Sequence, residues 1–150
     1  MIVTSHSARK PEILECHTLE EATALYPVIR QLRRRLTIVE FLDRFQKAKH
    51  GGYRLFYAKL SDSITGAIGF RTLDDLRWGH HLYIDDLIVD ECIQGKGIGS
   101  ALLLFAERFA MSEKCHSIRL AAGISRARAH EFYEQLSYRK VSAMFALELK

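Results

Sequence analysis

The chain has 150 residues, the length of one ordinary domain, so we expect a single domain over residues 1–150 with one hydrophobic core. Apolar residues make up 48% of it and charged residues 27%, proportions that exclude wholesale disorder and collagen-like or low-complexity chains. The net charge of +4 is mild, and no basic face with interleaved aromatic residues accompanies it, so we expect no nucleic-acid partner.

The sequence also predicts that the protein has no membrane or metal partner. Its longest unbroken apolar run, residues 101–106, is far shorter than the roughly 20 residues of a membrane-spanning helix. The N-terminus has no apolar stretch followed by a small-residue cleavage site, so no secretory signal is expected. Three widely spaced cysteines without a C-x-x-C pair argue against a zinc site. These features together favour a cytoplasmic protein.

The first half of the chain predicts one strand and two helices. Residues 11–17 alternate apolar and polar side chains, which is typical of a short strand. Thr18 and Glu21 have the spacing of a capping box, so a helix should begin at Leu19. Thr37 and Glu40 repeat that spacing before a second helix, which the Gly-Gly pair after residue 50 should end.

Strands and helices then follow in an order typical of the mixed α/β class. Strands are predicted over residues 53–60, 64–73 and 80–89, the first two forming a hairpin. Apolar residues at helical spacing predict a long helix from Ile98 to Phe109. A strand over 116–122, a helix over 128–136 and a last strand over 141–149 complete the order, and the strands on either side of the long helix should be parallel neighbours.

A glycine-rich segment lies where the buried strand passes through a loop into the long helix. Residues 94–100 read Gln-Gly-Lys-Gly-Ile-Gly-Ser. Glycines let a ligand approach the backbone closely, and the first turn of a helix offers unpaired N–H groups to a phosphate. Lys96 adds a cation and Ser100 a hydroxyl donor. A plain structural turn is the alternative explanation.

Two other phosphate-binding loops are excluded by residues that depart from their patterns. The dinucleotide fingerprint G-x-G-x-x-G needs a third glycine where Ser100 stands. The P-loop needs a glycine where Asp90 stands, and Ser or Thr after the lysine, where Gly97 stands.

The segment resembles the signature of the GNAT superfamily of acyl-CoA-dependent N-acetyltransferases, Gln/Arg-x-x-Gly-x-Gly/Ala, through Gln94, Gly97 and Gly99. Residues 129–138, Ala-His-Glu-Phe-Tyr-Glu-Gln-Leu-Ser-Tyr, are similar to the family's Ala-x-x-Phe-Tyr-x-x-Leu-Gly-Phe segment. The two motifs and the strand between them make the resemblance specific over residues 82–140. It implies a GNAT-like mixed α/β fold, with a central twisted sheet of about six to seven strands flanked by about four helices.

The resemblance also implies that acetyl-CoA is the co-substrate. The end of the buried strand would pair with the pantetheine arm, and the glycine-rich segment would hold the pyrophosphate through its backbone amides. Arg126 stands where the family often has asparagine, and there it would meet a phosphate. The residues expected to contact coenzyme A are Leu87, Ile88, Val89, Gln94, Gly95, Lys96, Gly97, Ile98, Gly99, Ser100 and Arg126.

Tyr133 falls on the tyrosine that usually serves as general acid to the departing thiolate in this family. A phenol with an ordinary pKa of about 10 is protonated at neutral pH and is well matched to protonating a thiolate. Judged from the residues alone, Tyr133 would instead be an aromatic packing residue beside Phe132.

Asp85 and Asp86 are two adjacent carboxylates inside an otherwise apolar strand. Burying a carboxylate is costly unless it is paired, so the pair needs a reason. One aspartate would take the proton of the amine or bind a cationic substrate, and the alternative is a salt bridge to an arginine. Because successive side chains of a strand point to opposite faces, we expect at most one of them to face a given site.

These features predict direct transfer of an acetyl group from acetyl-CoA to a primary amine in a ternary complex, with a small molecule as acceptor. Arg33, Arg34 and Arg35 follow the first predicted helix, in a region that often lines the acceptor site in the family, so an acidic group on the substrate is compatible with the sequence. The alternatives are a protein or peptide N-acetyltransferase, a non-catalytic acyl-CoA-binding module and, from the basic charge alone, a nucleic-acid binder. Dimers are frequent in the family, so a homodimer is also compatible with the sequence.

Overall fold

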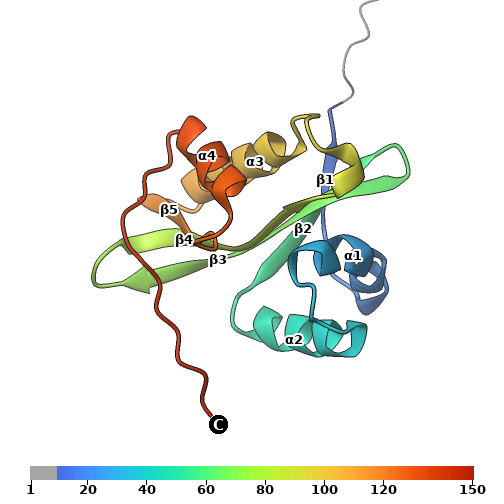
Figure 1. The fold of residues 1–150 in the computed structure, drawn as a ribbon, viewed down its shortest axis with the longest axis horizontal. Coiled ribbons are helices and arrows are strands. Elements are labelled where there is room, and N and C mark those ends of the chain that lie inside the picture. Colours follow the sequence, from blue (N-terminus) through green and yellow to red (C-terminus); the bar gives the residue numbers. More distant parts are fainter. Residues whose placement is uncertain (1–9) are drawn as a thin grey trace, which may run out of the picture. The chain divides into compact units, whose positions relative to one another are not determined.

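Five strands and four α-helices make up the regular structure of residues 10–150, the part of the chain that the computed structural model describes (Figure 1). The chain divides into two compact units, one ending at Arg119 and the other spanning Leu120–Lys150. No helix among the described residues is long and apolar enough to cross a membrane. The elements are β1 (Glu12–Glu15), α1 (Leu19–Leu32), α2 (Ile38–His50), β2 (Arg54–Leu60), β3 (Ser63–Asp75), β4 (Gly79–Val89), the short 3₁₀-helix η1 (Glu91–Ile93), α3 (Ile98–Ser112), β5 (Ser117–Leu120) and α4 (Ala127–Gln135).

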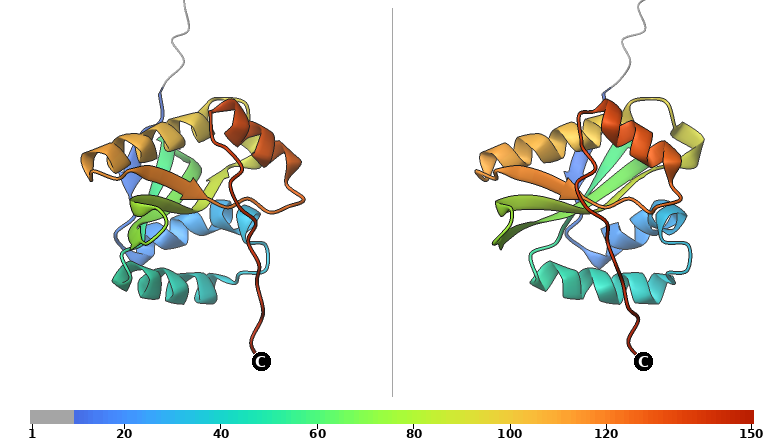
Figure 2. Two further views of the ribbon diagram at one scale, coloured as in Figure 1. Left: turned by 90° about the vertical axis from the view of Figure 1, so that its left-hand side faces the viewer. Right: turned by 60° about the vertical axis from the view of Figure 1, so that its left-hand side comes forward.

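The strands form one mixed sheet in the order β1-β2-β3-β4-β5. The first four strands are antiparallel neighbours, whereas β5 follows helix α3 and runs parallel to β4 (Figure 2). The predicted parallel step across the long helix is therefore confirmed, and so is the mixed α/β class with four helices. The sheet has five strands among the described residues, fewer than the six to seven expected.

Both faces of the sheet are covered by helices, with α1 and α2 on one face and α3 on the other (Figures 1 and 2). The core beneath α1 and α2 contains Leu25 and Phe45. Beneath α3, the rings of Phe56 and Phe70 stack with centroids 5.2 Å apart, and Phe105 packs against Phe56 at 4.7 Å. Burial of these apolar side chains holds the layers together, because it removes their surface from water.

The helix starts follow the capping signals in the sequence. Thr37 and Glu40 form the complete capping box: the threonine hydroxyl accepts from the Glu40 N–H at 3.2 Å, and the Glu40 carboxylate accepts from the Thr37 N–H at 3.1 Å. Thr18 caps α1 as predicted, through a 3.1 Å bond from the Glu21 N–H. The predicted capping box is incomplete here, because the Glu21 carboxylate accepts from the threonine hydroxyl and not from the Thr18 N–H.

The strand predicted over residues 141–149 is wrong, because that segment has no regular structure and pairs with no described strand. Its apolar side chains are exposed, Phe145 to 93% and Leu149 to 90%. Alternating apolar residues become a strand only where a neighbouring strand takes up their backbone hydrogen bonds, and sequence periodicity does not supply that neighbour.

Candidate active site

A β-bulge in β4 shapes the site. The ladder between β3 and β4 pairs Phe70 with Ile84 and Gly69 with Asp86, so Asp85 is an extra residue without a partner in β3. An extra residue breaks the strict alternation of side chains along a strand and re-aims those that follow it. The bulge therefore decides where the two adjacent carboxylates point.

The bulge places both carboxylates on the face covered by α1 and α2. Ile84 lies on the opposite face, because it pairs with Phe70, whose ring packs against α3. Regular alternation would put Asp86 on that same face as Ile84. The expectation that at most one aspartate faces a given site is therefore wrong: Asp85 and Asp86 line the same cavity.

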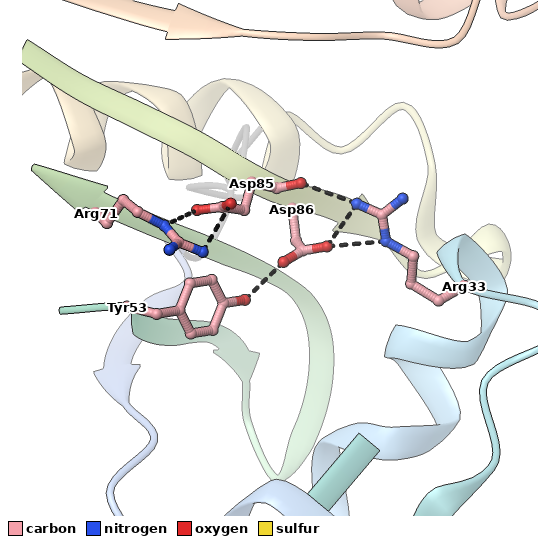
Figure 3. A network of polar contacts seen from close by, with 5 residues as sticks. All are labelled: Arg33, Tyr53, Arg71, Asp85 and Asp86. Carbon is pink, nitrogen blue, oxygen red and sulfur yellow. Dashed lines mark hydrogen bonds and ion pairs between the residues drawn. The ribbon is translucent and has the colours of Figure 1, made fainter. Parts of the chain in front are cut away.

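Arg33, just beyond the end of α1, fixes the bulge from the helical side (Figure 3). Its Nη2 donates to the Asp86 carboxylate at 2.8 Å and to the backbone carbonyl of Asp85 at 2.9 Å, while its Nε donates to Asp86 at 3.0 Å. One guanidinium thus binds both a carboxylate and a carbonyl of the bulge. A planar fork of donors suits arginine to this task and lysine poorly.

Arg71 of β3 pairs with Asp85 in a two-bonded arrangement, with both nitrogen–oxygen distances at 3.0 Å (Figure 3). Each aspartate therefore has an arginine partner, and the salt-bridge interpretation of these carboxylates is confirmed. Pairing offsets the desolvation cost of placing two carboxylates in an apolar strand, because each carboxylate has a hydrogen-bonded counter-charge.

Tyr53 supplies the remaining donor of the network. Its hydroxyl donates to the second carboxylate oxygen of Asp86 at 2.7 Å, and its ring is buried, with 9% exposed. Gly69 makes room for it, because a Cβ at that position would overlap the tyrosine hydroxyl. A glycine inside a strand often marks such a close approach, and here it lets the phenol reach Asp86.

Burial sets the proton affinities in this network. It raises the pKa of Tyr53 well above its ordinary value, with the neighbouring Asp86 charge acting in the same direction, so the phenol stays protonated. Burial is the largest single influence on Asp85 and, together with the neighbouring charge of Asp86, raises its pKa above the ordinary value of 3.8 against the hydrogen bonds and charge of Arg71. A carboxylate with a raised pKa is a stronger base than a free one.

The network lies against a cavity of about 870 Å³ between the α1–α2 layer and the sheet. Apolar walls come from both helices and from the segment that connects them. The lining residues are Ile29, Leu32, Arg33, Arg34, Arg35, Leu36, Glu40, Phe41, Arg44, Phe45, Ala48, Tyr53, Arg71, Tyr83, Asp85 and Asp86.

The glycine-rich segment forms the approach to α3. Gly95 and Gly97 have φ values of +83° and +76°, which favour glycine, and a Cβ at either position would meet no atom within 4 Å. Gly97 is the N-cap of α3 and provides no side-chain bond to the helix. The N–H groups of the first turn thus lack a side-chain partner, and Lys96 is exposed beside them. This backbone fits an anionic group such as a pyrophosphate.

The end of β4 has a free edge opposite β3. Residues 87–89 pair with β3 on one side, through Leu87 with Ile68 and Val89 with Gly66. On the other side β5 starts beside His80, where the His116 N–H donates to the His80 carbonyl at 2.7 Å. With four residues, β5 is too short to reach residue 87, so this edge has no strand neighbour in the described sheet.

The second unit carries Tyr133 and Arg126. Tyr133 lies in α4, where its ring packs against Phe132 and Tyr138 at centroid distances of 5.4 and 6.0 Å. Burial raises the pKa of Tyr133, and the nearby charge of Arg126, the N-cap of α4, lowers it by less. Ser137, where the family has glycine, adopts a left-handed φ of 71° and ends the helix as glycine would.

A family model and a related protein both show the family to which this chain belongs. The model of the acetyltransferase (GNAT) family matches residues 15–138. The chain belongs to the GNAT family of acetyltransferases. The uncharacterized N-acetyltransferase YhdJ of Bacillus subtilis (strain 168) is 30% identical over 115 residues, covering 76% of this chain and 81% of that protein.

Solved structures share the fold of this GNAT acetyltransferase at lower identity. A ribosomal-protein-alanine N-acetyltransferase from Brucella melitensis superposes with a TM-score of 0.78 at 18% identity, covering 94% of this chain and all of that one. An aminoglycoside acetyltransferase from an uncultured soil metagenomic sample gives a TM-score of 0.79 at 20% identity, covering 93% and 97% of the two chains. At these identities the likeness establishes the fold alone.

Two residues of the network in this GNAT acetyltransferase, Tyr53 and Arg71, were not predicted as site residues from the sequence. Tyr53 stands at the start of a predicted strand, and Arg71 has the place of an ordinary strand residue. The one available signal was Gly69, because a glycine inside a strand pattern indicates a bulge or a close approach.

Gly69→Ala should destabilise the protein, because the new Cβ would take the place of the Tyr53 hydroxyl and break its bond to Asp86. We expect the free energy of unfolding to fall by about 1–3 kcal/mol in urea denaturation. Gly51→Ala is the matched control, since its Cβ would meet only the Ala48 carbonyl at 3.5 Å. Equal effects of the two substitutions would contradict the role assigned to Gly69.

Asp85 should give stability a pH dependence of defined sign. With its folded-state pKa raised above 3.8, its stabilising contribution is fully present below that pH and is lost as the pH rises through the folded-state pKa. The unfolding free energy of the wild type minus that of Asp85→Asn should therefore fall as the pH rises above 3.8. Urea unfolding of both proteins over a pH series measures this difference, and a rise would contradict it.

Proposed function

We propose that this GNAT acetyltransferase transfers the acetyl group of acetyl-CoA to a primary amine by direct attack in a ternary complex. The observation that carries the proposal is the uncapped start of α3, where Gly95 and the N-cap Gly97 both have a positive φ. When bound, acetyl-CoA supplies an acetyl group activated as a thioester. The chain's own residues then have three tasks: to hold the cofactor, to handle the proton of the amine, and to protonate the thiolate.

Two backbone features support the binding of coenzyme A. The first-turn N–H groups of α3, with the Lys96 cation beside them, would hold the pyrophosphate. The free edge of β4 at Leu87, Ile88 and Val89 would accept the pantetheine arm as if it were an added strand. Arg126, exposed at the start of α4, would contribute a further cation to a phosphate.

Asp85 is the better candidate to take the proton of the amine. Its carboxylate lines the cavity, and its raised pKa brings it closer to the operating pH than an ordinary aspartate. Asp86 accepts three hydrogen bonds, from Arg33 and Tyr53, and would instead hold the bulge in shape. Tyr133 would be the general acid, since burial raises its pKa and keeps the phenol protonated.

The dimensions of the cavity support a small molecule as the acceptor. Its volume of about 870 Å³ lies within the range of roughly 300–1,000 Å³ typical of small-molecule sites. A screen of amines and of short peptides with free N-termini, read by the mass increase of acetylation, separates this acceptor class from a peptide. Mass detection is preferable to a thiol-release assay, because Cys92 is exposed and free.

Gly97→Asp should abolish binding of acetyl-CoA, because it places a carboxylate at the uncapped helix start and forces a side chain into a left-handed backbone. Calorimetric titration of the wild type and the variant with acetyl-CoA measures this. Gly52→Asp is the matched control, since Gly52 also has a positive φ of +91° and open surroundings. Unchanged affinity of Gly97→Asp for acetyl-CoA would contradict pyrophosphate binding by the glycine-rich segment. No binding of acetyl-CoA to the wild type would overturn the proposed activity.

Tyr133→Phe should lower kcat by roughly 100-fold or more, because the departing thiolate loses its proton donor. The fall of the rate at high pH, which reports ionisation of the acid, should shift or disappear. Tyr138→Phe removes a hydroxyl from a ring packed against Tyr133 and should leave kcat within a few fold. Full turnover of Tyr133→Phe with an unshifted pH profile would exclude the general-acid role.

A further inference from the structure

The charged side chains of the cavity are unequal in number. Five arginines line it, against the three carboxylates of Glu40, Asp85 and Asp86, which is an excess of two positive charges. A cavity lined by an excess of one charge raises the local concentration of ligands with the opposite charge. The ion pairs that each arginine makes within the chain show which of the five lack a counter-charge.

Three of the five arginines already have a counter-charge. Arg33 pairs with Asp86 and Arg71 with Asp85, at 2.8 and 3.0 Å. Arg34 faces Glu91, at 3.5 Å. These pairs account for the two aspartates of the cavity, whose charges are therefore not free to bind a purely cationic ligand.

Arg35 and Arg44 are the two cavity arginines that remain once these three pairs are set aside, against the single remaining carboxylate of Glu40, so one positive charge is left in excess. Within residues 10–150, neither side chain makes a hydrogen bond, an ion pair or a cation–π contact. Glu40, one helical turn before Arg44, forms no ion pair with it, and its carboxylate accepts from the Thr37 N–H at 3.1 Å. Two arginines without partners thus line one cavity, Arg35 from the α1–α2 connection and Arg44 from α2.

We propose that Arg35 and Arg44 bind an anionic group of the acceptor, so that the substrate is an amine that also carries a carboxylate or a phosphate. The inference rests on the proposed function, because it assigns the second end of the molecule whose amine is acetylated. Guanidinium groups bind both anions through paired N–H donors. The positive excess also disfavours acceptors with several amines, such as polyamines and aminoglycosides.

Two matched pairs of amines test the inference by binding, without any need for turnover. O-phosphoethanolamine is compared with ethanolamine, and γ-aminobutyrate with its amide, in calorimetric titrations of the full chain. The phosphate and carboxylate arms show which anion is preferred. We expect at least one anionic member to bind roughly 10-fold or more tightly than its neutral partner. Equal or tighter binding of both neutral members would overturn the inference.

Arg35→Gln and Arg44→Gln should each remove most of that preference while leaving the affinity for the neutral amine unchanged. Arg108→Gln, on α3 at the opposite face of the sheet, removes the same charge and should leave the preference intact. A preference that survives both cavity substitutions, or that Arg108→Gln reduces equally, would overturn the assignment to Arg35 and Arg44. Circular dichroism confirms that each variant is folded.

The proposed function is tested separately, by titration with acetyl-CoA and by the mass of the acetylated product. Selective anion binding without acetyl transfer would leave the cavity assignment standing and contradict the acetyltransferase activity. Transfer to neutral and anionic amines at equal kcat/KM would support the acetyltransferase activity and contradict the assignment of anion binding to the cavity.

Discussion

The extra residue in β4 is the constraint on which the site depends. Without it, Asp86 would share the face of Ile84 and lie among the phenylalanines beneath α3, where a carboxylate has no partner. With it, Asp85 and Asp86 both line the cavity, and the carbonyl of Asp85 leaves the strand ladder to bind Arg33. A single irregularity of backbone pairing thus turns an apolar strand into one that carries charge on one face.

The bulge is held by residues from three elements that are distant in the sequence. Arg33 binds it from the end of α1, Arg71 from β3, and Tyr53 from the residue before β2. The last turn of α1 also binds the segment that leads to the glycine-rich loop, since Gln31 accepts from the Glu91 N–H at 2.9 Å. The end of α1 therefore couples the geometry of the cavity wall to that of the proposed cofactor loop.

Much of the fold could be predicted from the sequence, because its local signals are strong. The capping box at Thr37 and the positive-φ glycines before α3 act within a few residues of themselves. The strand predicted at 141–149 failed, because its apolar alternation needs a neighbouring strand that the sequence does not identify. The aspartates were recognised as unusual, but their directions were assigned by regular alternation, which the bulge breaks.

The sequence by itself determined the order of the elements as far as α4, the glycine loop at the start of α3 and the family resemblance, because each rests on residues adjacent along the chain. Only the tertiary structure decided that both aspartates share one face, that Tyr53 reaches Asp86 across Gly69, and that Arg35 and Arg44 lack partners. These facts depend on the register between strands and on distances between residues far apart in the sequence. Neither quantity is encoded in local periodicity.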